Sequence, residues 1–219
     1  MRGALPEYPP LLQPVAHSLL QSLEEVQQHL AGLTPEQLWT RPGAGASAGY
    51  HVRHAAGSLE RLLTYARGEQ LSADQLRALK AEEEPDHEPD AAARLADAFA
   101  QAIERALAQV KATPESSLVE PRGVGRAQLP STVVGLLFHA AEHTQRHMGQ
   151  MVTTIKIVSQ DVALKKLGPA DSTTNYQLPT TNHQPPATNS HLSLEVGIWS
   201  LVVDTCYANP RKALLILRG

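Results

Sequence analysis

The 219-residue sequence contains one cysteine, and aromatic residues make up only 4 % of it. Cys206 alone cannot form an intramolecular disulfide or a cysteine-rich zinc site, so a disulfide scaffold is excluded. No run of about 18 apolar residues occurs, and the first residues lack the apolar core of a signal peptide. We therefore expect a cytoplasmic protein that does not span a membrane.

The chain also lacks a strong net charge, because 19 basic and 22 acidic residues leave a formal charge of −3. This balance provides no positive field of the kind that attracts nucleic acid or anionic lipid, so we expect neither as a partner. A hydrophobic content of 42 % is typical of a folded domain. With no cysteine cluster and no strong net charge, the ten histidines are the main candidates for functional residues.

The composition changes near residue 160. From Thr173 the chain contains three progressively diverging copies of a seven-residue unit, TTNYQLP, TTNHQPP and ATNSHLS, without an apolar heptad seam. Such a tract buries too little apolar surface to offset the entropy lost on ordering it. We therefore predict a helical domain over 1–160 and a poorly ordered, low-complexity tail over 161–219 that folding and metal binding do not require.

Apolar residues recur at helical spacing in four long segments before residue 160. They predict helices over about 11–30, 48–67, 91–113 and 132–158, the last three capped by Ser47, Asp90 and Ser131. Shorter features are a capping box at Thr34, a short helix after Ser72 and a hairpin within 113–130. The pattern predicts an all-α four-helix bundle with loops long enough for a crossover.

Three histidines recur every fourth residue on the predicted last helix, at His139, His143 and His147. Helical neighbours four residues apart have Cβ atoms roughly 5–6 Å apart, so two imidazoles can share one metal ion. His139 and His147 are about 12 Å apart along the axis, so all three cannot. His143 and His147 lie nearest the apolar centre of the helix, which favours that pair.

The predicted second helix begins with His51 and His54. If it packs against the last helix, one of them can complete a three-histidine site that leaves coordination positions open, as a catalytic site requires. The helical wheel mildly favours His51, because it lies closer to the apolar stripe. Periodicity alone leaves this choice open.

Together, HVRHAAGSLERLLTYARGEQLS and HAAEHTQRHMGQM resemble the motifs of the DinB superfamily, over about residues 10–158. The resemblance implies a DinB-like four-helix bundle in up-down-down-up order that binds a divalent metal cation, zinc or nickel. On the last helix it implies His143 and His147 as ligands. Gly149 and Gln150, which follow them, complete the motif. On the second helix it implies His54, which precedes Ala-Ala-Gly-Ser, with His51 as a neighbouring or substitute ligand.

Some members of that superfamily are thiol-dependent transferases and isomerases. The resemblance thus implies a metal-dependent enzyme that activates a low-molecular-weight thiol for transfer to an electrophile, and the thiol must be external because the predicted bundle contains no cysteine. The alternative is a non-enzymatic, metal-stabilised bundle that acts as a dimeric, stress-linked binding module, in which His51 is a fourth ligand. A homodimer is compatible with either interpretation.

The other polar residues near these motifs have simpler explanations. We expect the acidic residues 82–84 to form a solvated loop, and Glu142 to be solvated as well. Surface salt bridges are the expected role of three arginines, Arg53, Arg61 and Arg146. His139 is expected at the rim, and Gln150 is either an exposed helix residue or a partner of a ligand imidazole.

Overall fold

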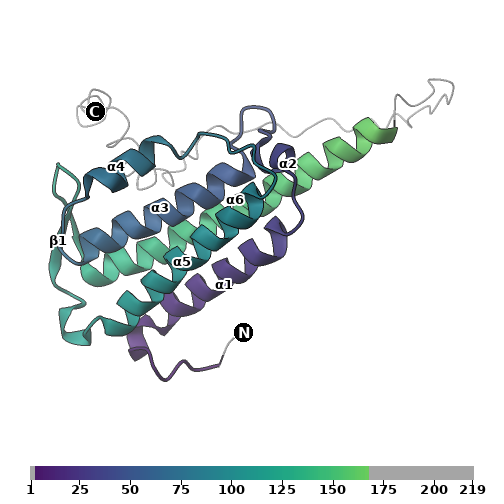
Figure 1. The fold of residues 1–219 in the computed structure, drawn as a ribbon. Helices are drawn as coiled ribbons and strands as arrows, with labels where there is room; N and C mark the ends of the chain where they lie inside the picture. The colour runs from purple at the N-terminus through teal and green to yellow at the C-terminus, as the bar shows by residue number, and fades with distance from the viewer. Residues whose placement is uncertain (1–2, 168–219) are drawn as a thin grey trace, which may run out of the picture. The chain divides into compact units, whose positions relative to one another are not determined.

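The computed structural model describes residues 3–167, and it is mainly helical (Figure 1). Its four long helices are α1 (Gln13–Leu30), α3 (Ala48–Ala66), α5 (Ala91–Ala112) and α6 (Val133–Leu167). The short elements are η1 (Pro10–Leu12), α2 (Pro35–Trp39), α4 (Ala73–Lys80), η2 (Glu115–Ser117) and a hairpin of β1 (Pro121–Val124) with β2 (Leu129–Thr132). The predicted all-α class is confirmed, whereas the predicted tail beyond residue 167 lies outside the described residues.

The helix directions follow from contacts between pairs of helices. Gln145 on α6 donates to Ser22 on α1, and Ser18 contacts Ala141 one turn earlier, so α1 and α6 run parallel. In the same way, Arg105 binds Glu60 and Gln109 donates to the Leu63 carbonyl, so α3 and α5 run parallel.

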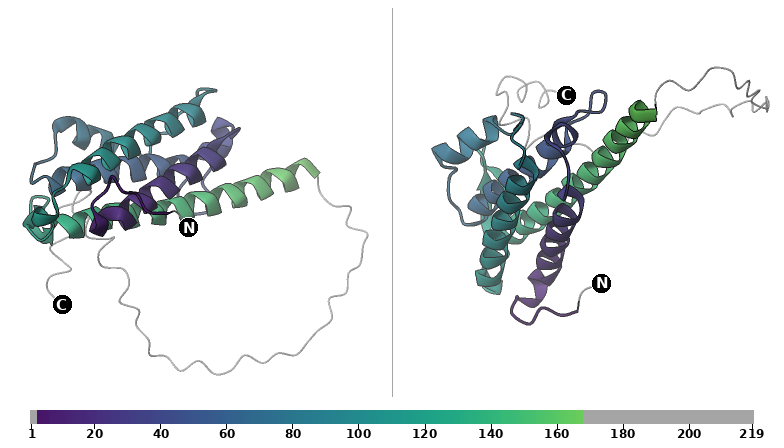
Figure 2. Two further views of the ribbon diagram at one scale, coloured as in Figure 1. Left: turned by 90° about the horizontal axis from the view of Figure 1, so that it is seen from below. Right: turned by 45° about the vertical axis from the view of Figure 1, so that its right-hand side comes forward.

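The second pair of helices is antiparallel to the first. His51 and His54 of α3 meet His147 and His143 of α6 in reverse order. The chain therefore runs up through α1, down through α3 and α5, and up through α6, and Figure 2 shows these four helices side by side. This confirms the predicted up-down-down-up order.

Parallel α3 and α5 require a crossover, and residues 67–90 provide it. Gly68, at φ +79°, ends α3 in the left-handed conformation that glycine adopts without strain. The chain then forms α4, which Gln75 ties back to α3 by donating to Thr64 Oγ1 at 2.9 Å. The crossover thus brings the acidic residues after α4 against α3.

The predicted helix starts are partly right. Ser47 Oγ accepts from the Tyr50 N–H at 3.1 Å, and the capping boxes at Thr34 and Ser72 are both formed. Asp90 stands at the N-cap position of α5, but its carboxylate binds Arg94 instead of a backbone N–H. Ser131 was the wrong cap for α6, because it pairs with Arg122 in the hairpin, and Thr132 Oγ1 accepts from Gly135 instead.

The helix α6 continues beyond its predicted end near Val158. After Val158 the apolar periodicity weakens, but the sequence contains no glycine or proline before Gly168 and Pro169. Because residues such as Gln, Ala, Leu and Lys favour a helix without needing a packed face, α6 extends to Leu167.

The bundle interior combines an apolar core with a layer of polar side chains. The largest fully buried residues come from all four long helices and include Leu19, Leu59, Phe99, Ile103, Leu137, Met148 and Met151. Polar residues are also buried, chiefly on α3 and α6, and they include His51, His54, Arg61, His143 and His147. Buried polar groups need partners, so this layer marks the candidate functional site. No helix among the described residues is long and apolar enough to cross a membrane.

Candidate metal centre

Two antiparallel helices bring four histidines together in the bundle interior. On α3, His51 and His54 are one turn apart, and on α6 the same holds for His143 and His147. The His54 and His143 Nε2 atoms are 3.1 Å apart, and the His51 and His147 Nδ1 atoms are also 3.1 Å apart. All four rings therefore meet at the interface of α3 and α6.

Three of these histidines, His54, His143 and His147, form a group that could hold a metal ion. Each offers a ring nitrogen, these atoms lie within 4.8 Å of one another, and all three residues are buried. Two nitrogens on one tetrahedral zinc ion, each at about 2.0–2.1 Å, are about 3.3 Å apart, which the 3.1 Å between His54 and His143 approaches. The donor set therefore fits a divalent cation.

The protonation of these rings also suits metal binding. Burial lowers the pKa of His143 to about 3 and that of His147 to about 2, and the neighbouring histidine rings add to this effect. Burial likewise lowers the pKa of His51 to about 4. Only a neutral imidazole has the lone pair that binds a metal ion, so His143 and His147 are in the ligand form at neutral pH.

Glu82, which no sequence pattern singled out, lies directly behind the histidine cluster. Its Oε2 accepts from His54 Nδ1 at 2.7 Å, and its Oε1 accepts from Arg61 at 2.6 Å. The solvated loop predicted for residues 82–84 is therefore wrong for Glu82, which is only 4 % exposed, although the two glutamates after it are exposed. The surface salt bridge predicted for Arg61 is wrong too, since Arg61 is 6 % exposed.

One signal in the sequence could have indicated this pair. Arg61 follows His54 by seven residues, which places both on the same face of a helix. An arginine on the face that carries a metal ligand needs a buried acid as its partner. The acid comes from a segment 21 residues away along the chain, and helical periodicity does not reveal its position.

The remaining candidates take different positions. His51 stands outside the group of three and contacts His147, so the helical-wheel preference for it is not reflected in this cluster. Half-buried His139 lies one turn from His143 and contacts Glu142 at 3.3 Å, and Glu142 also pairs with Arg146. Gln150 is exposed. Tyr50 stacks on the His54 ring, with centroids 5.3 Å apart.

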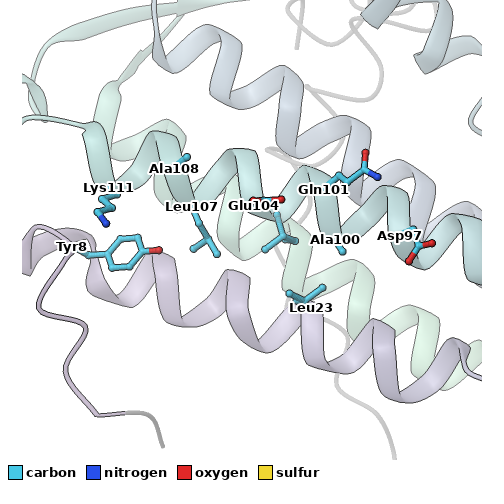
Figure 3. Close-up of a pocket in the computed structure, with 10 residues that line it drawn as sticks. Tyr8, Leu23, Asp97, Ala100, Gln101, Glu104, Leu107, Ala108 and Lys111 are labelled. Carbon is cyan, nitrogen blue, oxygen red and sulfur yellow. The ribbon is translucent and has the colours of Figure 1, made fainter.

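Two surface clefts lie beside the bundle helices. One, of about 610 Å³, runs between α1 and α5, where Tyr8, Leu23, Glu104 and Lys111 line it (Figure 3). The other, of about 500 Å³, lies behind Glu82 and is lined mainly by α3, α5 and the segment after α4. None of the three clustered histidines lines either cleft.

The metal-free protein is expected to lose stability as the pH falls below about 6.5, the ordinary histidine value. Below that pH the unfolded chain binds protons at His51, His143 and His147, whereas in the folded chain these rings stay neutral until about pH 4, pH 3 and pH 2. Each such histidine lowers the free energy of unfolding by at most about 1.4 kcal/mol for each unit by which the pH falls.

Urea denaturation with a chelator present, between about pH 7 and pH 5, measures this slope. The His147→Ala variant removes one of these three groups and should show a shallower slope. A free energy of unfolding that stays constant over this range would contradict the expectation.

The fold and the site can be compared with known proteins. A family model described as the DinB superfamily matches residues 18–151. A conserved protein from Enterococcus faecalis shares the fold with a TM-score of 0.54 and 20 % identity, over 68 % of this chain and 97 % of that one. A DinB-like protein from Bacillus cereus ATCC 10987 shares the fold with a TM-score of 0.53 and 15 % identity, over 68 % of this chain and 93 % of that one. No curated protein matches the sequence.

Proposed function

The chain belongs to the DinB superfamily, and from this premise we propose that it is a metal-dependent enzyme whose cation is bound by His54, His143 and His147. Zinc and nickel are the ions we propose, because both accept neutral imidazole ligands. The observation that carries the proposal is the three-nitrogen donor set within 4.8 Å, which leaves His51 outside it. Three protein ligands leave a coordination position for a substrate.

The reaction that we propose is the transfer of a low-molecular-weight thiol to an electrophile: the sulfur forms a bond to an electrophilic carbon, the thiol proton is released to solvent, and the leaving group of the electrophile departs with its bonding electron pair. A bound divalent cation lowers the pKa of a coordinated thiol and so supplies a thiolate at neutral pH. The chain does not provide that thiol from the bundle, because its one cysteine is Cys206. The three ligand imidazoles are buried, so the site is shielded from bulk water.

A conjugation assay tests this reaction. Zinc- or nickel-loaded protein is mixed with glutathione, cysteine or coenzyme A and an aryl halide, and the thioether product is followed. We expect metal-dependent turnover with at least one thiol, which disappears after chelation and in His147→Ala. Equal rates in the loaded protein, the chelated protein and the variant would overturn the proposed reaction.

The burial of the site favours one second candidate, a non-enzymatic, metal-stabilised module that acts as a dimer in stress-linked binding. His54, His143 and His147 are 3 %, 1 % and 8 % exposed, which is typical of a structural site. For such a module, metal raises the melting temperature, no thiol gives turnover, and sedimentation shows a dimer. For the enzyme, turnover accompanies the metal-dependent rise in melting temperature.

A further inference from the structure

We propose that Glu82 is a positioning residue that holds His54 in the one tautomer able to bind the metal ion. The inference rests on the proposed metal site, but its contacts are observed directly. His54 Nδ1 donates to Glu82 Oε2 at 2.7 Å, while the other ring nitrogen, Nε2, faces His143. The acidic segment after α4 thereby becomes part of the site, although it contributes no ligand.

The chemistry of the two partners sets the tautomer. A carboxylate has no proton to donate, so the proton between His54 and Glu82 belongs to Nδ1. The lone pair of the neutral ring is then on Nε2, the nitrogen that lies 3.1 Å from His143 Nε2. Without Glu82 the ring is free to carry its proton on Nε2, and in that form it cannot bind a metal ion there. The negative charge of Glu82 also makes the imidazole a stronger donor.

Two arginines of α3 hold Glu82 in this position. Arg61 donates to Glu82 Oε1 at 2.6 Å, and both side chains are buried. Arg53 donates to the backbone carbonyls of Ala81, at 3.2 Å, and of Glu84, on either side of Glu82. The segment is therefore fixed through its backbone and its side chain by one helix.

Arg53 is itself held by a neighbouring element. Its guanidinium lies 4.4 Å from the ring centroid of Trp39, the last residue of α2. This cation–π contact orients the side chain that holds the segment after α4. The support of His54 therefore extends from α2 to the crossover.

Gly57 provides the space that the carboxylate occupies. A Cβ atom at this position would lie 2.6 Å from Glu82 Oε1 and 2.7 Å from the Arg61 guanidinium. Both atoms are at the ends of flexible side chains, so alanine at position 57 would displace them without disrupting the backbone. Glycine lowers helix stability, and here its position is explained by the close approach of Glu82.

The first test compares Glu82→Gln with Glu83→Gln, which removes the same charge from the adjacent, exposed residue. Zinc affinity is measured by competition with a chromophoric chelator. We expect a loss of about 10- to 100-fold for Glu82→Gln, as for other partners of ligand histidines, and less than about 2-fold for Glu83→Gln. Equal affinities of the two variants would overturn the proposal.

A second measurement needs no metal and separates this inference from the proposed function. Nitrogen-15 NMR of the metal-free protein reports which nitrogen of His54 carries the proton. We expect the Nδ1–H tautomer in the wild type and a mixture with the Nε2–H tautomer in Glu82→Gln. If the wild type binds no metal but shows this change, the proposed function fails and Glu82 still positions His54. An unchanged tautomer would overturn the positioning role.

A third variant, Gly57→Ala, distinguishes positioning from a general effect on stability. Alanine at an open position in a helix interior is expected to raise the melting temperature of the metal-free protein by about 2–4 °C, whereas at position 57 the displacement of the buried Glu82 and Arg61 side chains offsets this gain. Gly149→Ala, whose added Cβ has no atom within 4 Å apart from its chain neighbours and its own helix backbone, calibrates that gain. We expect Gly57→Ala to lose at least about 10-fold in zinc affinity even where its stability is unchanged or higher. Wild-type affinity in Gly57→Ala would contradict the role assigned to Glu82.

Discussion

Replacing Arg61 by methionine is expected to lower the free energy of unfolding of the metal-free protein by about 3 kcal/mol. Arg61 and Glu82 are 6 % and 4 % exposed, and their atoms are 2.6 Å apart. Methionine fills much of the same volume but leaves the Glu82 carboxylate buried without its cation. Removing one partner of a buried ion pair costs about 3–5 kcal/mol, and the remaining bond to His54 places the expected value at the lower end.

The matched control for this prediction is Arg94→Met. Arg94 also binds two carboxylates, Asp86 and Asp90, but its side chain is 47 % exposed. Exposed ion pairs contribute less than about 1 kcal/mol, so urea denaturation should show a small change. If the two variants lost the same free energy, the Arg61 and Glu82 pair would not be the buried interaction described above.

Replacing His143 by alanine is expected to lower zinc affinity by more than about 100-fold. This loss of zinc affinity is larger than the one expected for Glu82→Gln. Glu82 only contacts a ligand histidine, whereas His143 itself supplies one of the three ligand nitrogens. His139→Ala is the matched control, since it removes the same side chain one turn earlier on α6, outside the group of three.

Competition with a chelator measures both variants. We expect less than about a 3-fold change for His139→Ala, which keeps all three nitrogens in place. A larger loss in His139→Ala than in His143→Ala would show that the metal ion binds at the other end of the histidine stripe. Circular dichroism of the metal-free variants confirms that both are folded.

Much of the fold could be predicted because its signals are local. Apolar spacing predicted the four long helices, and Ser47 and Ser72 acted as caps because a cap bonds only to residues two or three positions away. Asp90 and Ser131 failed as caps through competition from other partners. Arg94 binds the Asp90 carboxylate, and the hairpin keeps Ser131 in an extended strand.

The candidate site was predictable only in part. The spacing of His143 and His147 indicated that they share one helix face, and a resemblance between motifs, not periodicity, pointed to His54 rather than His51. Glu82 could not be found in this way, because it reaches His54 across 28 residues and through the crossover that α4 forms. Its burial depends on Arg53, Gly57 and Arg61 together, and such cooperation among distant residues leaves no periodic pattern in the sequence.

X-ray absorption spectroscopy of the zinc-loaded protein tests the proposed centre most directly. Imidazole rings give a characteristic outer-shell scattering, and the number of such rings bound to each ion can be fitted. We predict three imidazoles, from His54, His143 and His147, with nitrogen at about 2.0–2.1 Å and at least one further donor that the protein does not supply, such as a water oxygen. A spectrum with no imidazole scattering, or with four imidazoles in a closed shell, would contradict an open three-histidine site.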